Sequence, residues 1–193
     1  GGQWERALSL LEEMRTRGVE PNVVSFNAAI SACGAAGRWE HALSLLKEMP
    51  SRGVEPDAYS FNAAISACGA GKQWERALSL LLEMRTRGVE PDAYSFNAAI
   101  SACEKAKQWE RALSLLDDMR TRGVEPNVIS FNAAISACEK GGQWERALSL
   151  LEEMQSRGLE PDVISFSAAI SACGAGGQWE RALSLLEEMR TRG

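Results

Sequence analysis

The sequence has little of what enzyme and metal sites are usually built from. It contains one histidine, His41, and copies of the same segment elsewhere in the chain carry arginine at that place. No C-x-x-C pair occurs, so a zinc site has no ligand set. Residues 69–72 resemble part of a phosphate-binding loop, but no Ser or Thr follows the lysine and no strand precedes it. We therefore expect a protein that is not an enzyme and holds no cofactor or metal ion.

An excess of positive charge is also absent. The chain has 21 Lys and Arg against 26 Asp and Glu, for a formal net charge of −5. This balance argues against a protein that holds nucleic acid by bulk positive charge. No apolar run reaches the length needed to cross a bilayer, and no signal peptide is evident. We expect no membrane partner.

The five cysteines do not form a disulfide pattern. They recur every 35 residues, each at the same place in its own copy of a repeat: Cys33, Cys68, Cys103, Cys138 and Cys173. Adjacent units of a helical stack hold equivalent Cα atoms roughly 10 Å apart, whereas a disulfide spans at most about 7 Å. We expect small, buried, apolar thiols in a reducing compartment.

What the chain has in abundance is repetition. Its six tryptophans also recur every 35 residues: Trp4, Trp39, Trp74, Trp109, Trp144 and Trp179. A fixed period of about 20 to 50 residues indicates a stacked repeat architecture. The period predicts one continuous array over residues 1–193. It comprises a partial repeat 1–22, the repeats 23–57, 58–92, 93–127 and 128–162, and an incomplete repeat 163–193.

Each repeat contains two amphipathic segments with helical spacing. In residues 23–57 the first segment has apolar residues at i, i+3, i+4 and i+7, namely Phe26, Ala29, Ile30 and Cys33. The second segment has a stripe that we expect to be buried, made of Trp39, Ala42, Leu43, Leu46 and Met49. Gly53 then suits the left-handed residue after a helix end, and Pro56 prevents continuation.

A single hairpin of this kind cannot bury both stripes, so the hairpins must stack. We expect an all-α protein of eleven helices: a right-handed α-solenoid (superhelix) of stacked 35-residue helix-turn-helix repeats, with the first helices on the concave side. Pro50 replaces an arginine or glutamine of the other repeats and predicts an early end of its helix. Uncovered ends should leave Trp4, Leu8, Leu11 and the outward side of the last hairpin partly exposed, and allow self-association.

Polar side chains recur on the first helix outside its apolar stripe. With Phe26 at 0° and about 100° per residue, Asn27 lies at about 100° and Val24 at about 160°. Asn27 recurs as Asn62, Asn97 and Asn132 and becomes Ser167, and Val24 recurs as Tyr59, Tyr94, Ile129 and Ile164. An Asn in the first turn is favoured as a helix cap. An amide beside an apolar or aromatic surface can instead read and stack on the bases of single-stranded RNA.

The repeat unit resembles a pentatricopeptide repeat. The resemblance covers the whole chain and is carried by the 35-residue period and three motifs: the F-N-x-x-I opening, the A-L-x-L-x-x-x-M second helix and the G-[VL]-x-P-[DN] ending. It implies an organellar RNA-binding protein in which each repeat reads one base with its fifth and last residues. A tetratricopeptide repeat fits less well, because its period is about 34 and its W-x-x-L-G-x-x-Y signature is absent.

The resemblance implies one base-reading pair in each complete repeat. The pairs are Asn27 with Asp57, Asn62 with Asp92, Asn97 with Asn127, and Asn132 with Asp162, while Asn22 and Ser167 are half pairs at the ends. It further implies uracil for Asn–Asp and cytosine for Asn–Asn, and hence the core 5′-UUCU-3′.

Stacking and phosphate contacts also follow from the resemblance. Bases would be clamped between Val24, Tyr59, Tyr94, Ile129 and Ile164 of successive repeats. Phosphates would meet Lys105 and Lys140, whereas the other repeats have Ala35, Ala70 and Ala175 at that place. The family implies a chloroplast or mitochondrial location and a role in RNA processing or stabilisation.

A protein- or peptide-binding α-solenoid is the alternative, because an acidic chain suits a peptide better than RNA. We expect the last residue of each repeat to discriminate between the two. A peptide groove gives no reason for its restriction to Asp and Asn. A consensus-built scaffold fits the near-identity of the repeats as well as a recent duplication does.

Overall fold

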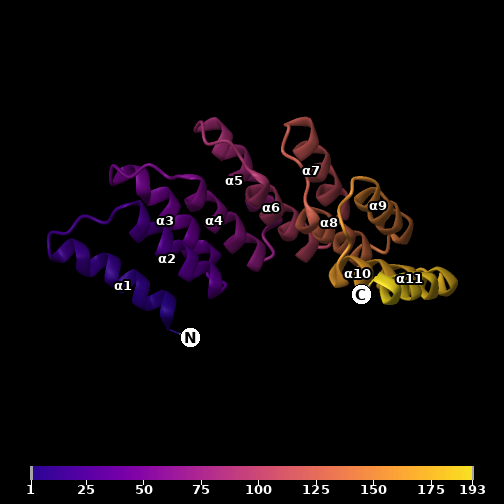
Figure 1. Ribbon diagram of the computed structural model, residues 1–193. Coiled ribbons are helices and arrows are strands. Elements are labelled where there is room, and N and C mark those ends of the chain that lie inside the picture. Colours follow the sequence, from indigo (N-terminus) through magenta and orange to yellow (C-terminus); the bar gives the residue numbers. More distant parts are fainter. Residues whose placement is uncertain (1, 193) are drawn as a thin grey trace. The chain divides into compact units, whose positions relative to one another are not determined.

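The computed structural model describes residues 2–192, which form eleven α-helices and no strand (Figure 1). The helices are α1 (Gln3–Thr16), α2 (Val23–Ala35), α3 (Trp39–Ser51), α4 (Ala58–Ala70), α5 (Trp74–Thr86), α6 (Ala93–Lys105), α7 (Trp109–Thr121), α8 (Val128–Lys140), α9 (Trp144–Ser156), α10 (Val163–Ala175) and α11 (Trp179–Arg192). The expectation of an all-α protein of helix-turn-helix repeats is confirmed.

The chain divides into two compact units, Gly1–Ala102 and Cys103–Gly193. In the first, α2 packs beside α4, and α3 contacts the first helix of its own repeat and that of the next (Figure 1). The second unit repeats this arrangement, with α8 beside α10 and α9 against both. Within each unit, therefore, neighbouring hairpins pack against each other through their first helices.

The first helix of each repeat begins at a side-chain cap. At α4, Asp57 Oδ1 accepts the backbone N–H of Ser60 at 2.8 Å, and the Asp57 N–H donates to Ser60 Oγ at 3.2 Å. Equivalent pairs cap the helices of the second unit: Asn127 and Ser130 at α8, and Asp162 and Ser165 at α10. These bonds satisfy amides that a helix otherwise leaves unpaired at its N-terminus.

Within residues 2–192, left-handed turn residues occur at two places of the repeat. The one after the second helix is always glycine, as expected for Gly53, which has φ of 71°. The one after the first helix is glycine in three repeats, such as Gly142 with φ of 69°, but lysine in two, Lys72 at 57° and Lys107 at 59°. A side chain with a Cβ is strained in this region, so these two lysines are candidates for stabilising substitution.

The buried core follows the predicted stripe on the first helix but only part of it on the second. Phe26, Ala29, Ile30 and Cys33 are all buried. On α3, Leu45 is buried where we expected Leu43, and Leu43 and Trp39 are half-buried. The prediction was wrong there because α4 of the next repeat packs against α3, and a single helix gives no indication of that contact.

All five cysteines are free and buried, as the spacing predicts. Burial raises the pKa of Cys68, Cys103 and Cys138 to about 11, so these thiols are protonated and unreactive at neutral pH. No helix within residues 2–192 combines the length and apolar character that crossing a bilayer requires.

Pro50 does not end its helix early. Helix α3 runs through Pro50 to Ser51 and is as long as α5, at 13 residues. The prediction was wrong because Pro50 lies in the last turn, where its missing N–H removes a single bond, to the carbonyl of Leu46.

The two ends of the array differ in exposure. Leu11 was expected to be partly exposed but is buried against α2, while Trp4 and Leu8 are half-buried. On α11 the expectation is confirmed: Trp179 is 65% exposed, and Leu183 and Leu186 are also exposed.

Candidate nucleic-acid interface

In the first unit the fifth residue of repeat 23–57 is hydrogen-bonded to the last. Asn27 Nδ2 donates to Asp57 Oδ1 at 3.2 Å. Ser60 Oγ, which belongs to the next repeat, donates to Asn27 Oδ1 at 2.6 Å and lies 2.9 Å from Asp57 Oδ1. Asn27 is only 7% exposed. The two candidate base-reading residues therefore form one cluster with a serine, in which Asn27 and Ser60 are buried and Asp57 is exposed.

The second unit contains the same cluster in repeat 128–162. Asn132 Nδ2 donates to both carboxylate oxygens of Asp162, at 3.0 and 3.1 Å. Ser165 Oγ donates to Asn132 Oδ1 at 2.5 Å. The same hydrogen-bonded arrangement therefore occurs in repeats 23–57 and 128–162.

Repeat 58–92 has a variant of this arrangement. Asp92 Oδ1 accepts the backbone N–H and the hydroxyl of Ser95, both at 2.9 Å, and also the side chain of Asn62. The carbonyl oxygen of Asn62 is buried and has no partner. A buried acceptor without a donor is costly, and a ligand that supplies an N–H would relieve the cost.

A helix-capping role was considered for Asn27, but another residue of the repeat has that role. Asn27 lies in the second turn of α2, and the cap of each first helix is the last residue of the preceding repeat, such as Asp57. Capping favours Asp or Asn at that residue without any RNA, although Ser caps equally well. The preference for Asp and Asn there does not by itself distinguish RNA binding from peptide binding.

Sequence reasoning also missed the serine of the cluster. Four of these serines are fully buried: Ser60, Ser95, Ser130 and Ser165. The signal was present, because each follows an Asp or Asn by three residues, the spacing of reciprocal capping.

The three aspartates of these clusters are held in the ionised form. Burial alone would raise the pKa of Asp57, but hydrogen bonds from Ser60 and Asn27 outweigh it and hold the pKa below the usual 3.8. The pKa values of Asp92 and Asp162 are lowered by the same balance. At neutral pH each cluster therefore presents a carboxylate beside an amide, a pair able to distinguish donors from acceptors on a ligand.

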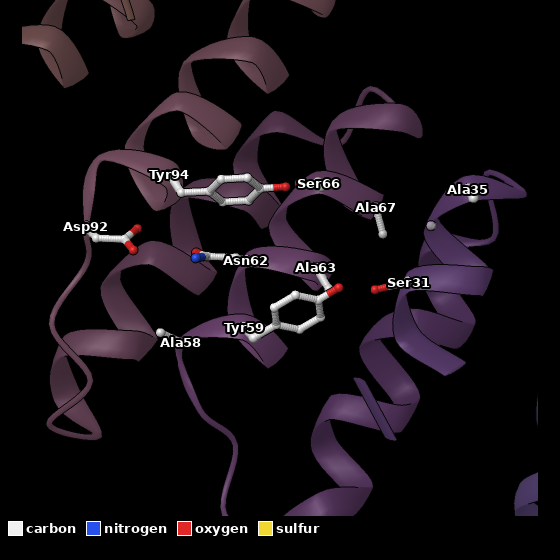
Figure 2. A pocket seen from close by; sticks show the side chains of 11 residues that line it. Ser31, Ala35, Ala58, Tyr59, Asn62, Ala63, Ser66, Ala67, Asp92 and Tyr94 are labelled. Carbon is white, nitrogen blue, oxygen red and sulfur yellow. The ribbon is translucent and has the colours of Figure 1, made fainter. Parts of the chain in front are cut away.

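The candidate stacking residues are exposed next to these clusters. Tyr59 is 60% and Tyr94 62% exposed. They line a pocket of about 630 Å³ that also contains Asn62 and Asp92. Figure 2 shows the two rings on either side of the Asn62 side chain, with Asp92 at one end. Val24, Ile129 and Ile164 are exposed at the same place in the other repeats.

The structure places the remaining candidates as follows. Asn22 is exposed and caps α2. Asn97 belongs to the first unit and Asn127 to the second. Ser167 lines a pocket of the second unit. Lys105 and Lys140 are exposed at the ends of α6 and α8, and Lys140 is ion-paired with Glu104.

Comparison with known proteins identifies the family of the repeat. The model of the PPR repeat family matches residues 1–34, 21–70 and 126–175. A pentatricopeptide repeat domain model matches residues 79–141, and a PPR repeat model matches residues 59–89 and 164–193. No curated protein sequence matches the chain.

Solved structures with this architecture include the pentatricopeptide repeat protein PPR10 from maize. It is 32% identical, with a TM-score of 0.80 over 100% of this chain and 28% of its own. PPR10 in complex with an 18-nt psaJ RNA element is 28% identical, with a TM-score of 0.76 over 100% of this chain and 32% of its own. The chain thus spans about a third or less of these PPR10 chains.

A more distant match is the PPR domain of Arabidopsis thaliana protein-only RNase P 1 in complex with tRNA. It is 17% identical, with a TM-score of 0.73 over 88% of this chain and 89% of its own, and it shows the fold alone. On the family models and the PPR10 match, the chain belongs to the pentatricopeptide repeat family.

Proposed function

We propose that this chain binds single-stranded RNA with one base per repeat, and that its preferred core is 5′-UUCU-3′. The observation that carries the proposal is the pocket of repeat 58–92, where Tyr59 and Tyr94 flank Asn62 (Figure 2). The PPR10 complex with an 18-nt RNA supports this use of the repeat.

The chemistry of the pocket suits a pyrimidine base. Base–aromatic stacking contributes about 1–3 kcal/mol per base, and here two rings are available to one base. Uracil and cytosine differ at the Watson–Crick edge by exchange of a donor and an acceptor. The orphan Asn62 oxygen accepts a donor, and Asp92 supplies the second polar group that distinguishes the two bases.

The charge balance of the repeats indicates that base stacking and hydrogen bonds provide most of the affinity for RNA. Repeat 23–57 has three Lys and Arg against four acids, and repeat 128–162 has three against six. Phosphate contacts are therefore few, and the salt dependence of binding should be shallow.

Alanine substitution of the tyrosines tests the proposal. Tyr59→Ala or Tyr94→Ala should weaken binding of a UUCU-containing RNA by about 1–2 kcal/mol, roughly 5- to 30-fold. Val24→Ala is the matched control at the same place in another repeat and should have a smaller effect. Equal affinity of both tyrosine variants and the parent would contradict the proposal.

A peptide-binding α-solenoid is the second candidate. It is favoured by the acidic balance and by the capping role of Asp57, which needs no RNA to account for it. If the protein binds an extended peptide through Tyr59 and Tyr94 and does not bind RNA, peptide binding is the better-supported function.

The wider role is proposed from the family. We infer a non-enzymatic RNA-binding array in chloroplast or mitochondrial RNA processing or stabilisation. Such an array needs no cofactor, and any chemistry would come from other regions of a longer chain or from a partner protein.

A further inference from the structure

The pockets at the candidate base-binding places differ between the two units. The second unit has a pocket of about 430 Å³ lined by Lys140, Ile164 and Ser167. These residues follow Ala35, Tyr59 and Asn62 of the first-unit pocket by three repeats. The two pockets are therefore equivalent places in the repeat.

Two carboxylates, Glu104 and Glu139, line the second pocket, and Glu104 belongs to the preceding repeat, at the end of α6. Gly34 and Ala35 stand three repeats before Glu139 and Lys140, so the first pocket has no charge at this place.

Glu104 neutralises the lysine that resemblance assigns to phosphate. Lys140 Nζ donates to Glu104 Oε1 at 2.5 Å, and the Glu104 side chain is only 17% exposed. A charge-assisted bond to a shielded carboxylate is stronger than a surface pair, since solvent screens it less.

Glu139 adds a negative charge at the same place. Its Oε1 accepts the hydroxyl of Ser171 at 3.1 Å, a bond that holds the side chain in the pocket without neutralising it. A phosphate approaching Lys140 therefore meets a paired lysine and one additional carboxylate.

We propose that Glu104 and Glu139 are negative determinants of RNA affinity in the second unit, which leaves Lys105 as the principal phosphate contact. The residue one repeat before Glu104 is Gly69, so the sequence has no carboxylate at that place. The inference rests on the proposed RNA function, and it assigns Lys140 to an ion pair with Glu104 rather than to a phosphate contact.

Neutralising Glu104 tests the proposal. Because one added phosphate contact to a single strand changes the salt slope by about 0.7, Glu104→Gln should tighten binding of a UUCU-containing RNA about fivefold at about 0.1 M salt. The slope of log affinity against log salt should steepen by the same amount. Glu139→Gln should also tighten binding.

A double-mutant comparison isolates the ion pair. In the parent, Lys140→Ala should change the affinity less than twofold, whereas Lys105→Ala should weaken it about fivefold. In the Glu104→Gln background, Lys140→Ala should return the affinity to that of the parent. Glu152→Gln, an exposed residue of α9, changes the net charge equally and is the control.

The possible failures are distinguishable. If RNA binds but Glu104→Gln behaves like Glu152→Gln, or if Lys140→Ala weakens the parent as much as Lys105→Ala, the inference is wrong and the RNA function stands. If neither the parent nor any folded variant binds RNA, the proposed function fails and the inference falls with it.

Discussion

Asn27 donates its side-chain amide to the carboxylate of Asp57, 30 residues later, and the same carboxylate caps helix α4. The pair proposed to read a base is therefore also part of the contact between two neighbouring repeats. Substitutions at this pair should change stability as well as recognition, whereas exchange between Asp and Asn keeps the cap, as Asn127 shows at α8.

Acid should destabilise the array through these aspartates. Their folded-state pKa values lie below 3.8, so their contribution to stability is complete above about pH 4 and is lost as the pH falls through the lowered values. Asp57→Asn keeps the cap but cannot titrate. It should reduce the difference in unfolding free energy between pH 7 and pH 3, measured with urea. An unchanged difference, equal to that of the surface control Glu152→Gln, would contradict this.

Replacing Pro50 should stabilise the first unit. Pro50→Ala restores the backbone bond to Leu46 and should raise the free energy of unfolding by about 1–3 kcal/mol. Pro50→Arg should add a further small gain, because Arg120 at the same place pairs with Glu153, 33 residues later, at 2.7 Å. Urea unfolding measures both effects. A Pro50→Ala variant no more stable than the parent would show that the helix tolerates proline here without cost.

Glycine should give a more stable protein than lysine at the left-handed turn after the first helix. Lys72 has φ of 57°, where L-residues are strained by roughly 1–2 kcal/mol, and the other repeats have glycine or Lys107. Lys72→Gly should raise the melting temperature, and the reverse change, Gly142→Lys, should lower it. Lys72→Gln removes the charge but keeps the Cβ, so it should leave stability unchanged. A gain in Lys72→Gln equal to that in Lys72→Gly would assign the effect to charge instead.

The sequence predicts the helices well, because each repeat carries its own helical periodicity and its own stop signals. Phe26, Ile30 and Gly53 lie where the pattern predicts. It fails where the neighbouring repeat decides the environment. Asn27 lies at about 100° from Phe26 on a helical wheel, outside the stripe of its own helix. Asn27 is nonetheless buried where repeat 23–57 meets the next repeat, and there it is hydrogen-bonded to Asp57 and Ser60.

The same reason accounts for Lys140. Its role was assigned from its place in one repeat, whereas its partner, Glu104, comes from the repeat before. Contacts between repeats depend on how helices are stacked, and the spacing within one repeat contains no information about that stacking.

The most direct test of one base per repeat exchanges the last residues of two adjacent repeats. Asp92→Asn together with Asn127→Asp keeps the net charge, and both Asp and Asn cap a first helix here, so the fold should be unchanged. The measurement is the affinity of the parent and the exchanged protein for RNAs containing 5′-UUCU-3′ and 5′-UCUU-3′. The account predicts that the parent prefers UUCU and the exchanged protein prefers UCUU. If the exchanged protein still prefers UUCU, or neither protein distinguishes the two RNAs, these residues do not read the bases.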